Sequence, residues 1–142
     1  MSKKKRKIAN LGKVITPVGH PNPPEPHEVE VATILARHYQ TTVEFIVPVD
    51  DYKRKSADII MLGVEWEIKS PTGTSKATIE NQFRRASKQQ AKNIVIDTRR
   101  TILDYDSIVR SVLFAMKERP SMRKVNRIII IDKSENVVAI KE

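Results

Sequence analysis

Asp58, Glu67 and Lys69 are the residues of this 142-residue chain whose types and spacing could do chemistry on a phosphate. They lie on the two strands of a predicted hairpin, in which two apolar, β-rich runs are separated by a turn at Leu62 and Gly63. Antiparallel pairing around that turn would place Asp58 opposite Glu67. Because side chains alternate along a strand, Lys69 would share a face with Glu67.

Two facing carboxylates repel each other, so this arrangement needs a compensating charge. A hard divalent cation supplies it, and Mg²⁺ is commonly held by one or two carboxylates together with water and substrate phosphate. We therefore expect Asp58 and Glu67 to bind Mg²⁺ or Mn²⁺. A lysine beside them, Lys69, could orient or help deprotonate an attacking water, or neutralise charge that develops on the phosphate.

The hydrophobic pattern around the hairpin predicts a mixed α/β domain. A strand with buried character is expected at 93–97, in the manner of a parallel sheet. The predicted helices are near 26–39, 77–92 and from Asp104 or Asp106 to Pro120. The predicted strands are at 42–47, 93–97, 127–132 and 137–140, together with the two strands of the hairpin at 57–69. Residues 1–26, which are basic and then proline-rich, are predicted to be an arm and linker, and 27–142 the functional domain.

Polar residues on two of these helices could complete the site. Glu28 falls near the middle of the apolar stripe of the first helix, whereas Glu30 lies toward its far side. Glu28 is either an ordinary first-turn acid or a member of the site. The second helix carries Gln82, Gln89 and Gln90 on or beside its mostly apolar face, where an amide needs a hydrogen-bond partner.

The chain carries a net charge of +9 with a pI near 9.9, which indicates a polyanionic partner, most commonly nucleic acid. The absence of cysteine excludes disulfides and thiolate zinc sites. No apolar run is long enough to cross a bilayer, so we expect a soluble chain. The cations expected to contact phosphates are Lys53, Arg54, Lys55, Lys76, Arg84, Arg85 and Lys88.

The order helix, three strands, helix, strand, with an acid on the second strand and Glu-x-Lys on the third, resembles the core of the PD-(D/E)xK nuclease superfamily. In this chain Ala57 precedes Asp58, whereas the PD-(D/E)xK motif has proline before that aspartate. Within that superfamily, residues 26–28, 57–59, 66–73 and 89–97 resemble the C-terminal tRNase toxin domain of CdiA-type contact-dependent growth-inhibition proteins. The resemblance covers the chain from about residue 27 to its end.

The resemblance implies an αβββαβ core with a mixed central sheet flanked by helices. It also implies a catalytic set of Glu28, Asp58, Glu67, Lys69 and a supporting glutamine, for which we choose Gln90. It further implies cleavage of tRNA in the bacterial cytoplasm after delivery into a neighbouring cell, and neutralisation by a cognate immunity protein.

Three alternatives remain open on the residues alone. The first is a DNA endonuclease of the same fold, because DNA and RNA present the same phosphates. The second is a metal-independent RNase in which His20, His27 or His38 supplies acid and base, with Lys69 stabilising an oxyanion. The third is a nucleic-acid-binding module without activity, in which Glu67 and Lys69 form an ordinary surface pair.

Overall fold

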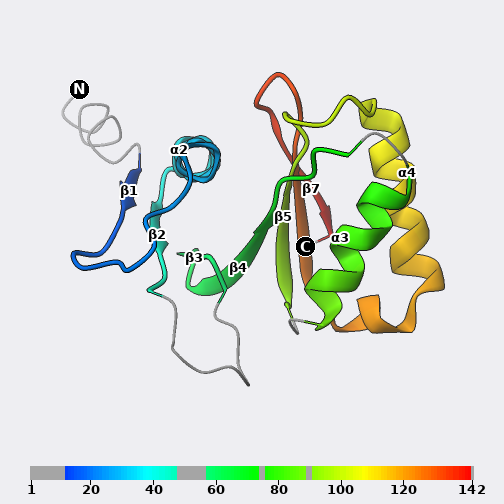
Figure 1. Ribbon diagram of the computed structural model, residues 1–142, viewed down its shortest axis with the longest axis horizontal. Helices are drawn as coiled ribbons and strands as arrows, with labels where there is room; N and C mark the ends of the chain where they lie inside the picture. Colours follow the sequence, from blue (N-terminus) through cyan, green and yellow to red (C-terminus); the bar gives the residue numbers. More distant parts are fainter. Residues whose placement is uncertain (1–11, 48–56, 74–75, 89–90, 142) are drawn as a thin grey trace, which may run out of the picture. The chain divides into compact units, whose positions relative to one another are not determined.

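The computed structural model describes residues 12–47, 57–73, 76–88 and 91–141, with the backbone alone at 76–77, 86–88 and 121. Contacts divide the chain into two compact units, Met1–Glu65 and Trp66–Glu142, and each is described by itself. Both units contain strands and helices (Figure 1). The predicted α/β class is confirmed, and so is the order helix, three strands, helix, strand along the chain.

The first unit consists of β1 (Lys13–Ile15), α2 (Pro26–Tyr39), β2 (Thr42–Phe45) and β3 (Ile59–Met61). Strand β1 runs parallel to β2, and β2 runs antiparallel to β3, so the sheet is mixed. Helix α2 packs against β1 and β2. The core residues of this unit are Val31, Ala32, Leu35, Ala36, Val43, Phe45, Ile59 and Met61, all buried.

Strand β1 was not predicted, because its three residues are too few to show an alternating pattern. It pairs in register with β2, with Lys13 beside Thr42 and Ile15 beside Glu44. Part of the segment expected to be an arm therefore belongs to a sheet.

The predicted turn at Leu62 and Gly63 is confirmed. Both residues have positive φ angles, +55° and +76°. Positive φ at both central residues is the requirement of a type I′ turn, the two-residue connection that matches the twist of a hairpin. Leucine rarely adopts this conformation, and Leu62 is half-exposed here.

The second unit contains most of β4 (Val64–Lys69), then α3 (Lys76–Lys88), β5 (Asn93–Asp97), α4 (Tyr105–Glu118), the 3₁₀ helix η1 (Pro120–Lys124), β6 (Arg127–Ile131) and β7 (Val137–Lys141). Strands β4, β5 and β6 are parallel, and β7 is antiparallel to β6. One face is covered by α3 and α4, through a core formed by Ile79, Phe83, Ile94, Ile96, Ile108, Val112, Ala115, Met122, Val125, Ile128 and Ile130.

Two boundaries in this unit differ from the sequence prediction. Helix α3 was expected to reach Lys92, but Ala91 and Lys92 are not helical. The carbonyl oxygen of Lys92 instead accepts hydrogen bonds from the backbone N–H groups of Asn126 and Arg127, at 2.6 and 3.3 Å. These bonds tie Lys92 to the start of β6. The 3₁₀ helix η1 was not predicted either.

Helix α4 begins directly after Asp104, one of the two acids that the sequence offered as its start. The Asp104 carboxylate accepts a hydrogen bond from the backbone N–H of Ser107 at 3.3 Å, which is the geometry of an N-cap. Hydrogen bonding to Ser107 lowers the pKa of Asp104 below its ordinary value.

The turn between β6 and β7 is built on the carboxylate of Asp132. It accepts backbone N–H groups from Ser134 and Asn136, at 2.9 and 2.8 Å, and the Asn136 side-chain amide at 3.1 Å. Burial acts to raise the pKa of Asp132, but the bonds from Asn136 and Ser134 outweigh it, so the pKa lies below its ordinary value. The ionised carboxylate is therefore the form that holds this turn.

Asp132→Ala is expected to lower the free energy of unfolding by about 1 kcal/mol at neutral pH, because the bonds are strong but exposed. Since folding lowers this pKa, the contribution is present above the unfolded value of about 3.9 and is lost as the pH falls through the folded value. Urea denaturation of both proteins between pH 7 and pH 2 measures the difference, which should narrow on acidification. A difference that stays constant with pH would contradict this role for the carboxylate.

Candidate active site

Glu67 and Lys69 form a nearly buried ion pair at the end of β4. The Lys69 ammonium lies 3.5 Å from Oε1 of Glu67, and each side chain is only 11% exposed. The prediction that these residues share a face is confirmed, because they are two positions apart on one strand. A surface pair would be largely open to water, so this pair is in an environment where its charges interact more strongly.

The register of β4 shows which face the pair occupies. Glu67 lies level with Ile94 and Lys69 level with Ile96 on the parallel strand β5. Both isoleucines belong to the core under α3 and α4. Since partners in parallel strands point to the same side, Glu67 and Lys69 lie on the face of the sheet that carries these helices.

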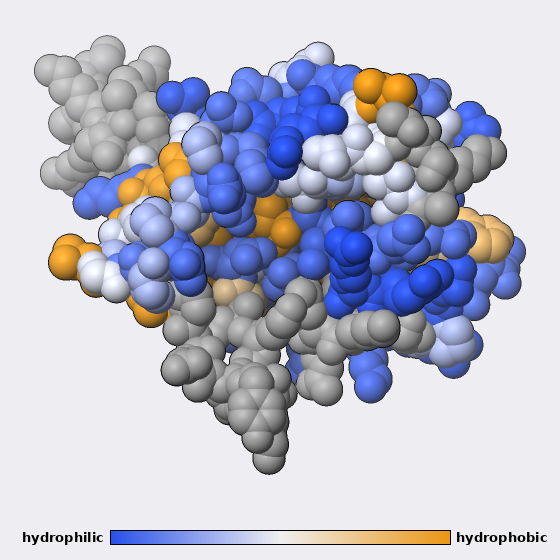
Figure 2. Space-filling model, in the orientation of Figure 1, coloured by the Kyte–Doolittle hydropathy of each residue, from blue (hydrophilic) through white to orange (hydrophobic). Residues whose placement is uncertain are grey.

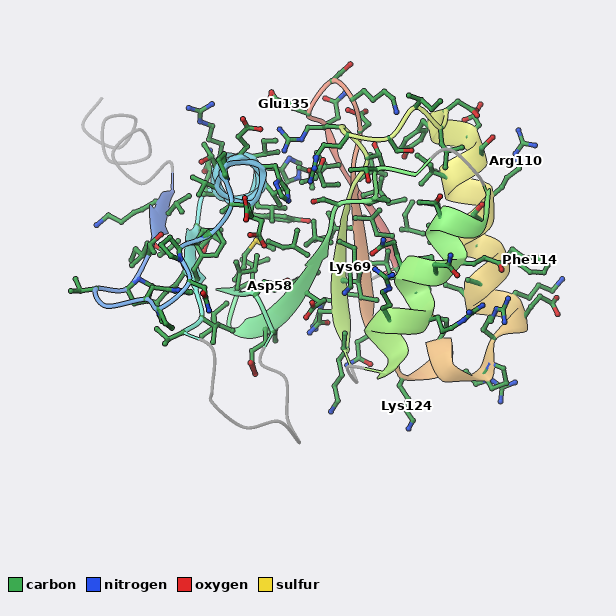
Figure 3. All side chains as sticks on the ribbon, in the orientation of Figure 1. Asp58, Lys69, Arg110, Phe114, Lys124 and Glu135 are labelled. Carbon is green, nitrogen blue, oxygen red and sulfur yellow. The ribbon has the colours of Figure 1, made fainter. Side chains whose placement is uncertain are left out.

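Asp58 lies directly before β3 in the first unit, and Lys69 is the last residue of β4 (Figure 3). Asp58 is half-buried, and its carbonyl oxygen accepts a hydrogen bond from the N–H of Ile46 at 3.0 Å. Its predicted pairing with Glu67 would join the two units and stays a prediction.

Glu28 takes part in capping α2. Its Oε1 accepts a hydrogen bond from the backbone N–H of Glu25 at 2.9 Å, while the N–H of Glu28 donates to the carbonyl oxygen of Glu25 at 2.9 Å. This is the local first-turn role that the sequence left open. Glu30 is exposed. A catalytic role for Glu28 stays a prediction.

The predicted glutamines and cations are only partly described. Gln82 is half-buried on α3, whereas Gln89 and Gln90 lie outside the described residues. Arg84 and Arg85 are exposed on α3, over which hydrophilic residues dominate the visible surface (Figure 2). Lys53, Arg54 and Lys55 lie outside the described residues, as do the side chains of Lys76 and Lys88.

The three histidines all belong to the first unit. His20 holds a loop together: its Nδ1 accepts the N–H of Asn22 at 3.3 Å, and its Nε2 lies 3.2 Å from the carbonyl oxygen of Ile46. These contacts favour the tautomer with its proton on Nε2. His38 is exposed and stacks edge-on against Tyr39, with ring centroids 4.7 Å apart. Neither contact is one that acid–base catalysis would need.

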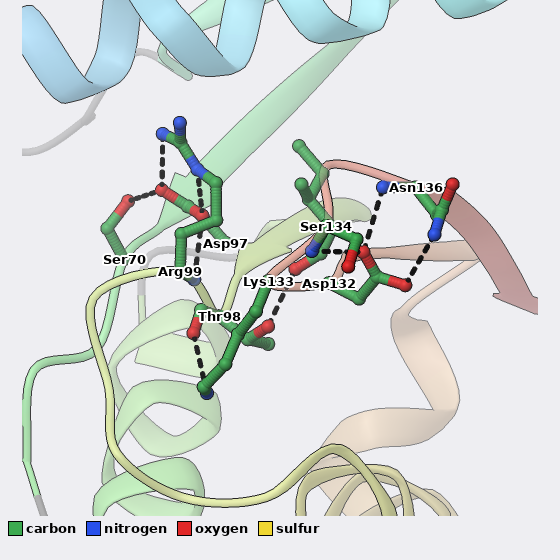
Figure 4. A network of polar contacts seen from close by, with 9 residues as sticks. Ser70, Asp97, Thr98, Arg99, Asp132, Lys133, Ser134 and Asn136 are labelled. Carbon is green, nitrogen blue, oxygen red and sulfur yellow. Dashed lines mark hydrogen bonds and ion pairs between the residues drawn. The ribbon is translucent and has the colours of Figure 1, made fainter.

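Sequence reasoning missed a buried polar network beside the end of β4. Asp97, at the end of β5, is fully buried and is held by Arg99, with Nε donating to Oδ1 at 2.8 Å and Nη2 to Oδ2 at 3.1 Å. The Ser70 hydroxyl adds a contact at 3.4 Å to Oδ2 (Figure 4). An aspartate closing an apolar strand, followed two residues later by arginine, was the signal available.

Asp58 and Glu67 are suitable donors for a divalent cation, because carboxylate oxygens are the hard ligands that Mg²⁺ and Mn²⁺ take. Within the described ranges, no three His, Cys, Asp or Glu side chains gather as a group. The carboxylate of Asp97, the last residue of the neighbouring strand β5, is paired with Arg99.

Fold and site together define a small basic α/β domain with an acid–lysine pair at the carboxyl end of a parallel strand. Residues 55–137, more than half of the chain, match the family described as the contact-dependent growth inhibition CdiA C-terminal domain. The chain belongs to this family, and is a C-terminal toxin domain of a contact-dependent growth-inhibition system.

The fold is also that of a solved structure. A chain of the CdiA-CT/CdiI toxin and immunity complex from Burkholderia pseudomallei is 20% identical in sequence, with a TM-score of 0.66. The similarity covers 90% of this chain and 100% of that one. No curated protein sequence matches the chain. None of the helices in the described part of the chain is long and apolar enough to cross a membrane.

Proposed function

We propose that this toxin domain is a metal-dependent endonuclease that cleaves RNA, with tRNA favoured over DNA. The observation that carries the proposal is the nearly buried pair of Glu67 and Lys69, 3.5 Å apart at the end of β4. A carboxylate held beside an ammonium in a low-dielectric setting is suited to phosphodiester hydrolysis. Toxins of this family are generally nucleases, which supports the same reaction class.

In this proposal Asp58 and Glu67 hold Mg²⁺ or Mn²⁺. When bound, the cation would act as a Lewis acid toward the phosphate oxygens. The Glu67 carboxylate that would be one of the ligands lies 3.5 Å from the Lys69 ammonium. Glu28 and Gln90 are the proposed supporting residues, one at the start of α2 and the other just after the described end of α3.

Lys69 acts on the nucleophile and on the developing charge. Its ammonium is restrained by the ion pair with Glu67 and by burial of its stem, so its position is set before substrate arrives. From there it orients a water for attack on phosphorus and neutralises negative charge that builds on the phosphate. Such preorganised electrostatic groups contribute about 10²–10³ in rate.

The positive charge of the chain binds the substrate backbone. Arg84 and Arg85 are exposed on α3, and the net charge is +9. Affinity for nucleic acid should therefore fall steeply with salt, as expected when phosphate contacts dominate. Lys53, Arg54, Lys55, Lys76 and Lys88 are proposed to add to this surface.

We also propose a cognate immunity protein as a partner. The solved structure with the same fold comes from a complex of a toxin with its immunity protein. A nuclease carrying +9 charges presents a strong field to an acidic inhibitor, which favours fast and specific association.

Removing metal is expected to abolish the reaction. The purified chain should degrade total tRNA in Mg²⁺ or Mn²⁺, leave supercoiled plasmid DNA intact, and lose its activity in EDTA, because Asp58 and Glu67 no longer share a cation. Gel electrophoresis of both substrates under the three conditions measures this. Adding Mn²⁺ should also raise the melting temperature, since a ligand that binds only the folded state stabilises it.

Glu67→Gln provides the control for the metal site, because it keeps the side-chain volume and removes the charge. It should lose both the cleavage and the Mn²⁺-dependent rise in melting temperature. Cleavage of plasmid DNA would move the substrate to DNA with the chemistry unchanged. RNA cleavage that persists in EDTA would contradict the proposal and favour a metal-independent RNase in which histidines act as acid and base.

A further inference from the structure

The loop between β5 and α4, residues 98–103, is held in one conformation by side chains on both of its flanks. The Thr98 hydroxyl donates to the carbonyl oxygen of Ile131 at 2.7 Å, and the Thr101 hydroxyl donates to that of Gly73 at 2.6 Å. Both threonines are almost fully buried, with 1% and 2% of their surface exposed. A loop with two buried anchors is more rigid than an ordinary surface connection.

A lysine from the next strand connection closes the same loop. The Lys133 ammonium donates to the carbonyl oxygen of Thr98 at 3.3 Å (Figure 4). It also donates to the carbonyl oxygen of Leu103 at 2.8 Å, so it bridges the two ends of the loop. Arg99, inside the loop, is fastened to the buried Asp97 by its backbone N–H and its guanidinium.

These anchors also connect the loop to the segment that directly follows Lys69. Ser70 contacts Asp97, and Gly73 accepts the hydrogen bond of Thr101. Strands β4 and β5 are parallel, so Lys69 and the 98–103 loop lie at the same, carboxyl-terminal edge of the sheet. In open α/β sheets this edge is where ligands bind.

Arg100 is the exposed cation of this loop, positioned between the residues that anchor it. We propose that Arg100 binds a backbone phosphate of the nucleic-acid substrate next to the scissile bond. The guanidinium is suited to this because its planar N–H groups match phosphate oxygens in pairs. Anchoring of the loop lowers the ordering cost that an arginine on a flexible loop would incur on binding.

This inference rests on the proposed function only in taking nucleic acid as the substrate, so it is tested by binding rather than by cleavage. The 142-residue chains, all carrying Lys69→Ala, are titrated into fluorescein-labelled tRNA, and binding is followed by fluorescence anisotropy. Arg100→Gln is expected to weaken affinity roughly tenfold, the effect of losing one charge-assisted contact. It should also reduce the slope of log affinity against log salt by about one.

Arg110→Gln is the matched control, because Arg110 is exposed and points outward from α4 (Figure 3). It makes the same change in net charge but should alter affinity less than about twofold. If the two glutamine variants lose affinity equally, the effect of Arg100 is one of general charge and the inference is wrong.

Thr101→Val tests whether the loop positions Arg100, since it removes the hydroxyl that donates to Gly73. It should weaken binding in the parent chain but add nothing in the Arg100→Gln chain, because the two changes act through one contact. Strictly additive losses would overturn the positioning role. Circular dichroism confirms that the variants are folded.

The outcomes separate this inference from the proposed function. A chain that cleaves tRNA but binds it equally well after Arg100→Gln would leave the nuclease proposal standing and refute the role of Arg100. A chain that cleaves nothing, but loses affinity and salt slope on this substitution, would refute the nuclease proposal and support Arg100 as a phosphate-binding residue.

Discussion

Lys69→Ala is expected to abolish tRNA cleavage, with a loss of at least about 100-fold in rate. The ammonium of Lys69 lies 3.5 Å from Glu67 and carries a positive charge that can act on the phosphate. Alanine removes that charge and leaves the strand intact, so binding of tRNA should remain. Single-turnover cleavage and anisotropy titration, made on the same preparation, separate the two effects.

Lys117→Ala is a suitable control, because Lys117 is an exposed lysine in the last turn of α4 and its loss changes the net charge equally. It should cleave at the rate of the parent chain. Cleavage by Lys69→Ala at more than about a tenth of the parent rate would show that this lysine is not part of the chemistry. The family assignment would not be affected, since it rests on the match over residues 55–137.

Asp97→Ala is expected to have the largest effect on stability, lowering the free energy of unfolding by about 3–5 kcal/mol. Asp97 is fully buried, and its partner Arg99 has only 15% of its side chain exposed. Removing the carboxylate takes a buried charge partner away from the Arg99 guanidinium, and it also releases Ser70. Urea denaturation, followed by circular dichroism, measures the change.

Arg99→Ala should lower the free energy of unfolding by a similar amount, because it removes the guanidinium that pairs with the fully buried Asp97 carboxylate. Asp106→Ala removes an exposed acid from the first turn of α4 and should change stability by less than about 0.5 kcal/mol. If Asp97→Ala lowered the free energy of unfolding by less than about 1 kcal/mol, the ion pair of Asp97 with Arg99 would not be what holds the segment at Ser70 to the loop after β5.

Elements with strong local signals were predicted with correct bounds. Strand β5 was predicted from its short apolar run, and the structure confirms that all five residues from Asn93 to Asp97 are buried. Helix α2 begins at Pro26, and α4 is bounded by the Asp104 cap and Pro120. In each case the residues that determine the structure are adjacent in the chain.

Elements without such signals were missed or misplaced. Strand β1 exists because β2 offers it a pairing edge, not because of its three residues. Lys92 is not helical, and its carbonyl oxygen accepts hydrogen bonds from Asn126 and Arg127, more than thirty residues further along the chain. No local pattern carries that information.

Some features of the candidate site were likewise predictable from local sequence, and others were not. That Glu67 and Lys69 share a face follows from the sequence alone, because a strand repeats every two residues. The position of the turn at Leu62 and Gly63 was likewise predicted from the sequence, because two apolar, β-rich runs flank it.

Only the tertiary structure could show how deeply the pair is buried, and that Ser70 meets Asp97 and Gly73 meets Thr101 across 27 and 28 residues of sequence. Such contacts form because parallel strands bring their carboxyl ends to one edge, and which strands become neighbours is decided by packing of the whole unit. The sequence by itself thus determined the chemical types at the site, and folding decided which loops surround them.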